Sequence, residues 1–539
     1  MDIFGILSMI GGLALFLYGM EAMGAGLSKL SGGRMERLLE KLTSKRIMAV
    51  LLGAGVTAVI QSSSATTVMV VGFVNSGIMK LNQAVGIIMG ANIGTTITSW
   101  LLSLTGIQGS SFVLKMLKPS SFSPILAIVG IIFIMFTKDE KKKDIGGIFL
   151  GFAILMYGME AMSGAVAPLA DNEKFTGILT MFSNPILGLL AGTILTAVIQ
   201  SSSASVGILQ ALCATGAVNF STALPIIMGQ NIGTCVTAII SSIGTSKNAK
   251  RAAAVHLFFN ISGTVIFMVV FYTLNAFVHF SFLNTAASPA GIAVIHSLFN
   301  IGATILLFPF ANLLEKMAIL AIPDKGSEVE EMEEEKINPD LARLDERFLD
   351  KPGFAMEECR GVAINMARKS KKAMNLAIDL LKEYDEKTSA RVEKLENQID
   401  QYEDALGTYL VKLSERDLSV KDSRTLSVLL HCIGDFERIS DHAVNIRGAA
   451  VEMNKKNLQF SDKAKQELLV FSNAIRDIID RAVLAFETGD TALAKEVEPL
   501  EQVVDALNKE EKQRHINRLR TGTCTIELGF VLSDISTNF

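Results

Sequence analysis

The chain has 539 residues, half of them hydrophobic, and its 50 Lys and Arg nearly balance its 54 Asp and Glu. This balance excludes the basic excess of a nucleic-acid-binding protein, and five scattered cysteines without a CxxC pair argue against a disulfide scaffold. Residues 1–324 carry 18 basic and 12 acidic residues, whereas residues 325–539 carry 32 and 42. We therefore expect a basic membrane part followed by an acidic soluble part, with no cleaved signal peptide.

Long uncharged runs in the first part predict membrane-spanning helices. No charged residue occurs in the 72 positions of 175–246 or in the 63 positions of 252–314. Because hydrocarbon excludes charge, apolar runs of about 18 residues or more are typical of membrane spans. The segments long enough to cross are 4–27, 83–104, 123–137 (the shortest), 145–166, 222–243, 252–279 and 291–314. The predicted fold class is all-α, a polytopic membrane protein with a helical soluble domain.

Three motifs recur at an offset of 139 residues. YGMEAM occurs at 18–23 and 157–162, TAVIQSSSA at 57–65 and 196–204, and NIGT at 92–95 and 231–234. This register indicates a duplication, with repeats at about 4–137 and 145–279 and a final helix at 291–318 within a transport domain 1–322. The QSSSA segments, about 47–79 and 184–220, have small and polar residues in their middle. They fit re-entrant hairpins better than spanning helices, since irregular backbone at membrane depth must face protein or water.

Loop charge predicts the orientation of the repeats. Thirteen basic residues, in Ser28–Arg46, Lys138–Lys143 and Lys247–Arg251, fall on one side of the predicted crossings, and three fall on the other. The positive-inside rule then places these loops and the tail in the cytoplasm and the N-terminus outside, in a multi-pass cell-membrane protein. Three crossings separate the two YGMEAM copies, so the repeats should be inverted. Inverted repeats with broken helices are typical of secondary transporters, whose site lies where the repeats meet.

The paired hairpin tips predict an anion site that also needs cations. If the chain breaks at Gln61 and Gln200, the following serines begin new helices whose N–H groups and positive dipole ends favour an anion. The spans contain no Lys or Arg to neutralise it, so cations must arrive with it. NIGT segments, flanked by glycine, could unwind and supply oxygen ligands, or they could be packing motifs. Glu21 and Glu160 are either functional or interfacial, and His256 and His296 are expected to be satisfied packing residues.

The paired QSSS and GANIGTT/GQNIGT motifs resemble those of the type II sodium–phosphate cotransporter family, over roughly residues 1–320. The resemblance implies sodium-coupled transport of inorganic phosphate, with Na+ as the coupling ion, and a homodimer. Carried over, the phosphate contacts are Gln61, Ser62, Ser63, Ser64, Gln200, Ser201, Ser202 and Ser203. The sodium ligands would be Gln61, Ser64, Asn92, Thr95, Gln200, Ser203, Asn231 and Thr234.

The acidic second part is predicted to be a helical bundle. Residues 323–340 are an acidic linker, and helical periodicity follows at 353–384, 386–414, 421–455, 461–488 and 490–520. DFERISDHAVNI at 435–446 resembles the signature of PhoU-like regulatory domains, whose acidic ExxxD motifs bind metal clusters. By that resemblance, Glu437 and Asp441 are candidate metal ligands in a PhoU-like domain 341–539, and Asp435 is a weaker one. Other ExxxD pairs are Glu396/Asp400 and Glu501/Asp505. The bundle is expected to be truncated in its sixth helix.

These features lead to one main hypothesis and two rivals. The main hypothesis is a sodium-coupled inorganic phosphate symporter working by alternating access, with a cytoplasmic PhoU-like regulatory tail. The rivals are a phosphate exporter and a non-transporting phosphate receptor. No nucleophile–base pair or nucleotide-binding loop is visible, so the protein is not expected to be an enzyme.

Overall fold

A computed structural model describes residues 3–31, 45–106, 118–169, 172, 177, 179, 181–323, 338 and 340–539. The described residues form helices joined by short loops and contain no named β-strand. Contacts divide the chain into two units, Met1–Ile337 and Asn338–Phe539. Most of the predicted acidic linker and of the basic Ser28–Arg46 loop lies outside the described residues, as do Lys115 and Lys174.

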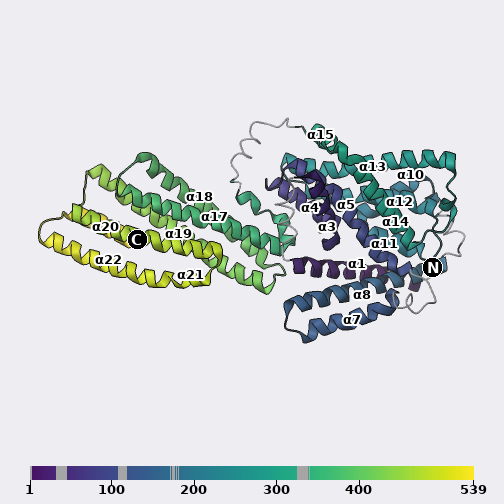
Figure 1. The fold of residues 1–539 in the computed structure, drawn as a ribbon, viewed down its shortest axis with the longest axis horizontal. Helices are drawn as coiled ribbons and strands as arrows, with labels where there is room; N and C mark the ends of the chain where they lie inside the picture. Colours follow the sequence, from purple (N-terminus) through teal and green to yellow (C-terminus); the bar gives the residue numbers. More distant parts are fainter. Residues whose placement is uncertain are drawn as a thin grey trace. The chain divides into compact units, whose positions relative to one another are not determined.

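The first unit contains two successive copies of one helix order (Figure 1). Six of the described helices are long and apolar enough to cross a membrane, and α7 and the four helices that flank the QSSS motifs are shorter. The first copy comprises α1 (Ile3–Ser31), α3 (Arg46–Ile60), α4 (Ser63–Asn75), α5 (Leu81–Ser103) and α7 (Pro119–Phe136). The second comprises α8 (Glu140–Val166), α10 (Pro185–Ile199), α11 (Ser202–Cys213), α12 (Phe220–Ser241) and α13 (Lys247–Val278), followed by α14 (Pro289–Leu307) and α15 (Ala311–Ala321).

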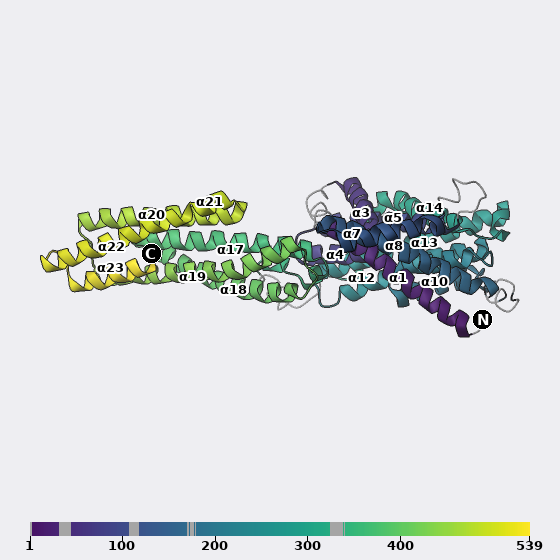
Figure 2. The same cartoon turned by 90° about the horizontal axis from the view of Figure 1, so that it is seen from below.

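Helices α1 and α8, which carry the two YGMEAM copies, lie side by side and run in opposite directions (Figures 1 and 2). A Cβ added to Gly12 would lie 3.0 Å from the Gly158 carbonyl oxygen, and one added to Gly19 would lie 2.6 Å from that of Gly151. Only glycine permits so close an approach of two backbones. Because facing residue numbers fall along α8 as they rise along α1, the equivalent helices of the two copies are antiparallel, as an inverted repeat requires.

A second glycine seam appears once in each copy, between α3 and α5 and between α10 and α12. A Cβ on Gly90 would lie 1.9 Å from the Val50 carbonyl oxygen, and one on Gly229 would lie 2.0 Å from that of Leu189. These glycines flank the NIGT motifs, which lie inside the continuous helices α5 and α12. Of the two interpretations of NIGT, unwinding and packing, the structure agrees with packing, because its own glycines, Gly94 and Gly233, also lie against a neighbouring backbone.

The second unit is a bundle of long amphipathic helices. Helices α17, α18 and α19 pack on one another (Figure 2), and their apolar faces meet at buried residues such as Met366, Ile399 and Leu406. The predicted helix 490–520 is divided in two, because Pro499 has no N–H and fits the first turn of α22. The bundle helices are α17 (Pro352–Leu380), α18 (Glu386–Ser414), α19 (Val420–Lys456), α20 (Asp462–Thr488), α21 (Thr491–Lys495), α22 (Val497–Arg520) and α23 (Ile526–Asn538).

Candidate functional site

The chain breaks at the glutamine of each QSSS motif, as predicted. Gln61, which follows the last residue of α3, has φ 61° and ψ 22°, and Gln200, which follows the last residue of α10, has φ 59° and ψ 21°. Both residues are in the left-handed region, which costs a non-glycine residue roughly 1–2 kcal/mol. Two identical strained positions 139 residues apart indicate that the break is a maintained feature of both copies.

The serine after each glutamine caps the next helix. The Ser62 hydroxyl accepts the Ala65 N–H at 3.1 Å, and the Ser201 hydroxyl accepts the Ala204 N–H at 3.2 Å. The other N–H groups in the first turns of α4 and α11 have no acceptor within their own helix. Each QSSS motif therefore presents backbone donors and hydroxyls at the positive end of a helix dipole, a common anion-binding arrangement.

The two tips meet, although they come from different copies. The Ser64 hydroxyl of the first copy lies 3.4 Å from the Gln200 carbonyl oxygen of the second. Ser63, Ser202 and Ser203 are buried, each 4–5% exposed. In the described part of the chain, no Lys or Arg side chain bonds to a QSSS residue. Arg46 instead bonds to Asn312, and Arg251 bonds to the Ile322 carbonyl oxygen.

Two threonines that the sequence analysis did not single out contact the glutamines. The Thr98 hydroxyl donates to Gln61 Oε1 at 2.9 Å, and the Thr237 hydroxyl lies 3.4 Å from the Gln200 carbonyl oxygen. They are equivalent positions in the two copies. Each follows the NIGT threonine by three residues, a spacing that places both on one helix face. That spacing was the available sequence signal.

The NIGT side chains are buried next to this region, with oxygens left available. Asn92 donates through Nδ2 to Asn260 Oδ1 at 2.7 Å, and Asn231 donates through Nδ2 to the Ile227 carbonyl at 2.9 Å. No described residue donates to either asparagine Oδ1. The Thr95 and Thr234 hydroxyls donate back to the carbonyls of residues 91 and 230, so their lone pairs remain. Amide, hydroxyl and carbonyl oxygens are hard ligands suited to small cations.

The intramembrane titratable residues take different positions. Glu21 and Glu160 are exposed on the surface of the first unit. His296 shares a hydrogen bond of 2.7 Å with Ser99 through Nδ1. His256 is fully buried, and within the described residues neither of its ring nitrogens has a partner. The expectation of a satisfied packing histidine is therefore wrong for His256.

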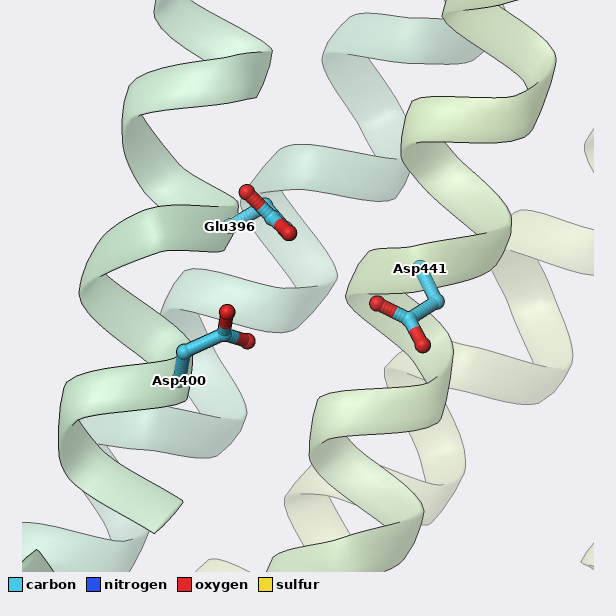
Figure 3. A group of neighbouring side chains, drawn as sticks. All are labelled: Glu396, Asp400 and Asp441. Atoms are coloured by element: carbon cyan, nitrogen blue, oxygen red, sulfur yellow. The ribbon is translucent and has the colours of Figure 1, made fainter. Parts of the chain in front are cut away.

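In the second unit, acidic side chains from two helices converge (Figure 3). One carboxylate oxygen from each of Glu396, Asp400 and Asp441 lies within 4.8 Å of the others. Burial, and then repulsion by Asp441, raises the pKa of Asp400. Burial and the same neighbour also raise the pKa of Glu437, one turn before Asp441 on α19. These acceptor-only groups, which repel one another, have the chemistry of a hard divalent-cation site.

This acidic group differs partly from the predicted metal ligands. Asp441 belongs to it, and Glu437 adjoins it, while its other two members come from the Glu396/Asp400 motif on α18. Asp435 is exposed and does not belong to the group, nor do Glu501 and Asp505 of the third ExxxD motif.

Comparison with known proteins agrees with this architecture. The profile of the Na+/Pi-cotransporter family matches residues 15–164 and 154–289, and the PhoU domain profile matches residues 363–448. The two cotransporter matches correspond to the two copies, and the PhoU match covers most of α17, all of α18 and much of α19. No solved structure matches the chain.

Curated relatives differ in how much of the chain they cover. "Putative inorganic phosphate export protein YjbB" of Salmonella typhimurium is 24% identical over 95% of this chain and 91% of its own length. "Uncharacterized protein YqeW" of Bacillus subtilis is 29% identical over 58% of this chain and 97% of its own. "Sodium-dependent phosphate transport protein 2A" of Rattus norvegicus is 39% identical over 20% of this chain and 17% of its own. With both copies matched across half of its length, the chain belongs to the Na+/Pi-cotransporter family and also carries a PhoU domain.

Proposed function

We propose that the protein couples the movement of inorganic phosphate to sodium, with phosphate held between the two QSSS tips. The observation that carries this proposal is the contact between the two QSSS tips, at which α4 and α11 begin, with no Lys or Arg of the described residues bonded to either tip. Exposed N–H groups and hydroxyls favour an oxyanion. A divalent oxyanion at membrane depth needs countercharge, and since no described Lys or Arg bonds to the tips, co-transported cations would provide it.

Phosphate and sodium would use different atoms of the same motifs. Backbone N–H groups and hydroxyls donate to phosphate at Ser62, Ser63 and Ser64 and at Ser201, Ser202 and Ser203. Oxygen atoms of the glutamines and of the NIGT side chains would coordinate sodium. Thr98 and Thr237 join this set, because each contacts a tip glutamine. Sodium bound by these oxygens would lie next to phosphate, so that the opposite charges of the two ions stabilise each other.

Transport itself would follow from the inverted repeat. Two oppositely oriented copies can exchange their conformations, so that the site opens first to one side and then to the other. The second unit, which we place in the cytoplasm, would regulate this exchange. A divalent cation held by Glu396, Asp400 and Asp441, with Glu437 beside them, would order α18 against α19. We also propose a homodimer, on the resemblance to the animal cotransporters.

Export is a second candidate for the physiological direction. The relative named for phosphate export aligns with 95% of this chain, second unit included, whereas the rat sodium-dependent protein aligns with 20%. The same coupled site can run either way, because the gradients of sodium and phosphate set the direction of net flux.

Flux of radiolabelled phosphate in proteoliposomes tests these proposals. We expect phosphate uptake driven by an inward sodium gradient, loss of that uptake when choline replaces sodium, and efflux when the gradient is reversed. Phosphate flux that is unchanged in choline would overturn sodium coupling. Phosphate binding without flux in either direction would favour a receptor.

A further inference from the structure

Helices α13 and α14 share a motif that is unrelated to the 139-residue duplication. HxxFNIxxT occurs at 256–264 and again at 296–304, an offset of 40 residues. Every named side chain except the isoleucines is at most 5% exposed: His256, Phe259, Asn260 and Thr264, and His296, Phe299, Asn300 and Thr304. In both helices the asparagine donates through Nδ2 to the carbonyl of its histidine at 2.9 Å. The two occurrences of the motif thus share the same hydrogen bond within their own helix.

Only the α13 copy reaches a candidate ion ligand. The bond to the His256 carbonyl uses the amide nitrogen of Asn260, and this fixes Asn260 Oδ1 as an acceptor. Asn92 Nδ2 donates to that acceptor at 2.7 Å. The opposite orientation of either amide would bring two donors or two acceptors together, so the network determines both orientations. It leaves the Asn92 oxygen without a described donor.

We propose that Asn260 is a positioning residue that holds the Asn92 oxygen toward sodium in the first repeat. This inference rests on the proposed sodium coupling and on Asn92 as a ligand. In the second repeat, Asn231 is held by the Ile227 carbonyl of its own helix. Asn260 also touches that repeat, because its Nδ2 lies 3.3 Å from the Sγ of Cys235, which is not a candidate ligand. The two sodium positions are therefore supported differently, and a change at Asn260 should weaken one of them.

Sodium dependence of phosphate flux in proteoliposomes of the full chain tests this inference. We expect Asn260→Ala to raise the sodium concentration for half-maximal flux about tenfold, the effect of one lost buried hydrogen bond. The phosphate concentration for half-maximal flux, at saturating sodium, should change less than about twofold, because the QSSS donors are untouched. Asn260→Asp keeps an oxygen acceptor for the Asn92 amide and should restore most of the sodium affinity.

Asn300→Ala is the matched control. Asn300 makes the same bond to its histidine carbonyl, but its Oδ1 has no partner among the described residues. It should leave the half-maximal sodium concentration unchanged while it perturbs folding to a similar extent, as measured by thermal unfolding in detergent. An equal sodium shift in Asn300→Ala would show a general packing effect and overturn the inference.

A double-mutant cycle separates positioning from structure. If Asn260 acts through Asn92, Asn260→Ala should add less than about twofold to the sodium shift of Asn92→Ala. Independent, multiplying effects would overturn the inference. If Asn260→Ala does not fold, Asn260→Ser replaces it in the cycle. Wild-type protein without sodium-dependent flux would instead refute the proposed function. Sodium-dependent flux that shifts in Asn92→Ala but not in Asn260→Ala would refute only the positioning role.

Discussion

The two QSSS hairpins have the same nine-residue core sequence but different surroundings. In the first, Gln61 is 8% exposed, and the Thr57 hydroxyl donates to Thr66 across the hairpin at 3.0 Å. In the second, Gln200 is exposed. The equivalent hydroxyls there, on Thr196 and Ser205, are fully buried, and neither has a partner in the described part of the chain. Identical sequence therefore specifies the break in each hairpin, but not how tightly that hairpin is enclosed.

The difference arises from helices that occupy equivalent places in the two copies. Helix α7 packs against α8, whereas its counterpart α13 packs against α12 and also against α4 and α5 of the first copy. The first hairpin is therefore covered by α13, and the second has no equivalent cover from α7 among the described contacts. A single conformation of an inverted repeat is expected to be asymmetric in this way, since alternating access exchanges the two arrangements.

The largest effect should come from the glycine seams, which the two copies share. Gly90→Ala places a Cβ 1.9 Å from a backbone oxygen, and Gly229→Ala places one at 2.0 Å, so both should abolish folded protein in size-exclusion chromatography. Gly55→Ala is the control, because no atom lies within 4 Å of its added Cβ. If only one of the two variants failed to fold, the two glycine seams would not contribute equally to the stability of the fold.

Substitution of the serine that caps each QSSS tip should have the second-largest effect. Ser62→Ala and Ser201→Ala remove the cap and a phosphate donor, and we expect each to reduce phosphate flux at least about tenfold. Ser62→Gly and Ser201→Gly separate the two roles, because glycine at a cap costs only a few tenths of a kcal/mol. Near-normal flux in the glycine variants would restrict these serines to capping.

Thr57 and Thr196, which occupy equivalent positions in the two hairpins, should differ in how much they contribute to stability. Thr57→Val breaks the bond to Thr66 and should lower the free energy of unfolding by about 1 kcal/mol. Thr196→Val removes a buried hydroxyl without a described partner, so it should be neutral or stabilising. Thermal unfolding at matched detergent concentration measures both. Equal destabilisation would mean that the second hairpin closes as the first does.

The smallest effect should appear at the acidic group of the second unit. Burial and mutual repulsion raise the pKa values of Glu396, Asp400 and Glu437 in the folded state. Raised carboxyl pKa values favour the folded state at acidic pH, and that contribution is lost as pH rises through them. At pH 7, Mn2+ or Ca2+ should therefore raise the melting temperature slightly. Asp441→Asn should remove this response, and Glu501→Gln, from the motif outside the group, should not.

Sequence alone predicts much of this molecule, because duplication makes a weak local signal appear twice. The breaks at Gln61 and Gln200, the antiparallel copies and most bundle helices were predicted from spacing and periodicity. The state of the NIGT segments was not, because a glycine permits either unwinding or close packing, and only the facing helix decides. Thr98 and Asn260 were missed for a similar reason. Their relevance comes from side chains on other helices, at distances that no local pattern encodes.

The seam between α1 and α8 also sets how far Glu21 and Glu160 lie from the axis that relates the two copies. Gly12 lies opposite the turn from Gly158 to Met162, and Gly19 lies opposite the turn from Gly151 to Leu155. The axis relating the copies then crosses α1 near Phe16, which leaves Glu21 about 7 Å to one side and Glu160 about 7 Å to the other, at 1.5 Å per residue. If that axis lies at the bilayer centre, both carboxylates are well inside a half-thickness of about 15 Å. Carboxylates at that depth are costly against acyl chains, so this face requires water or another protein surface beside it.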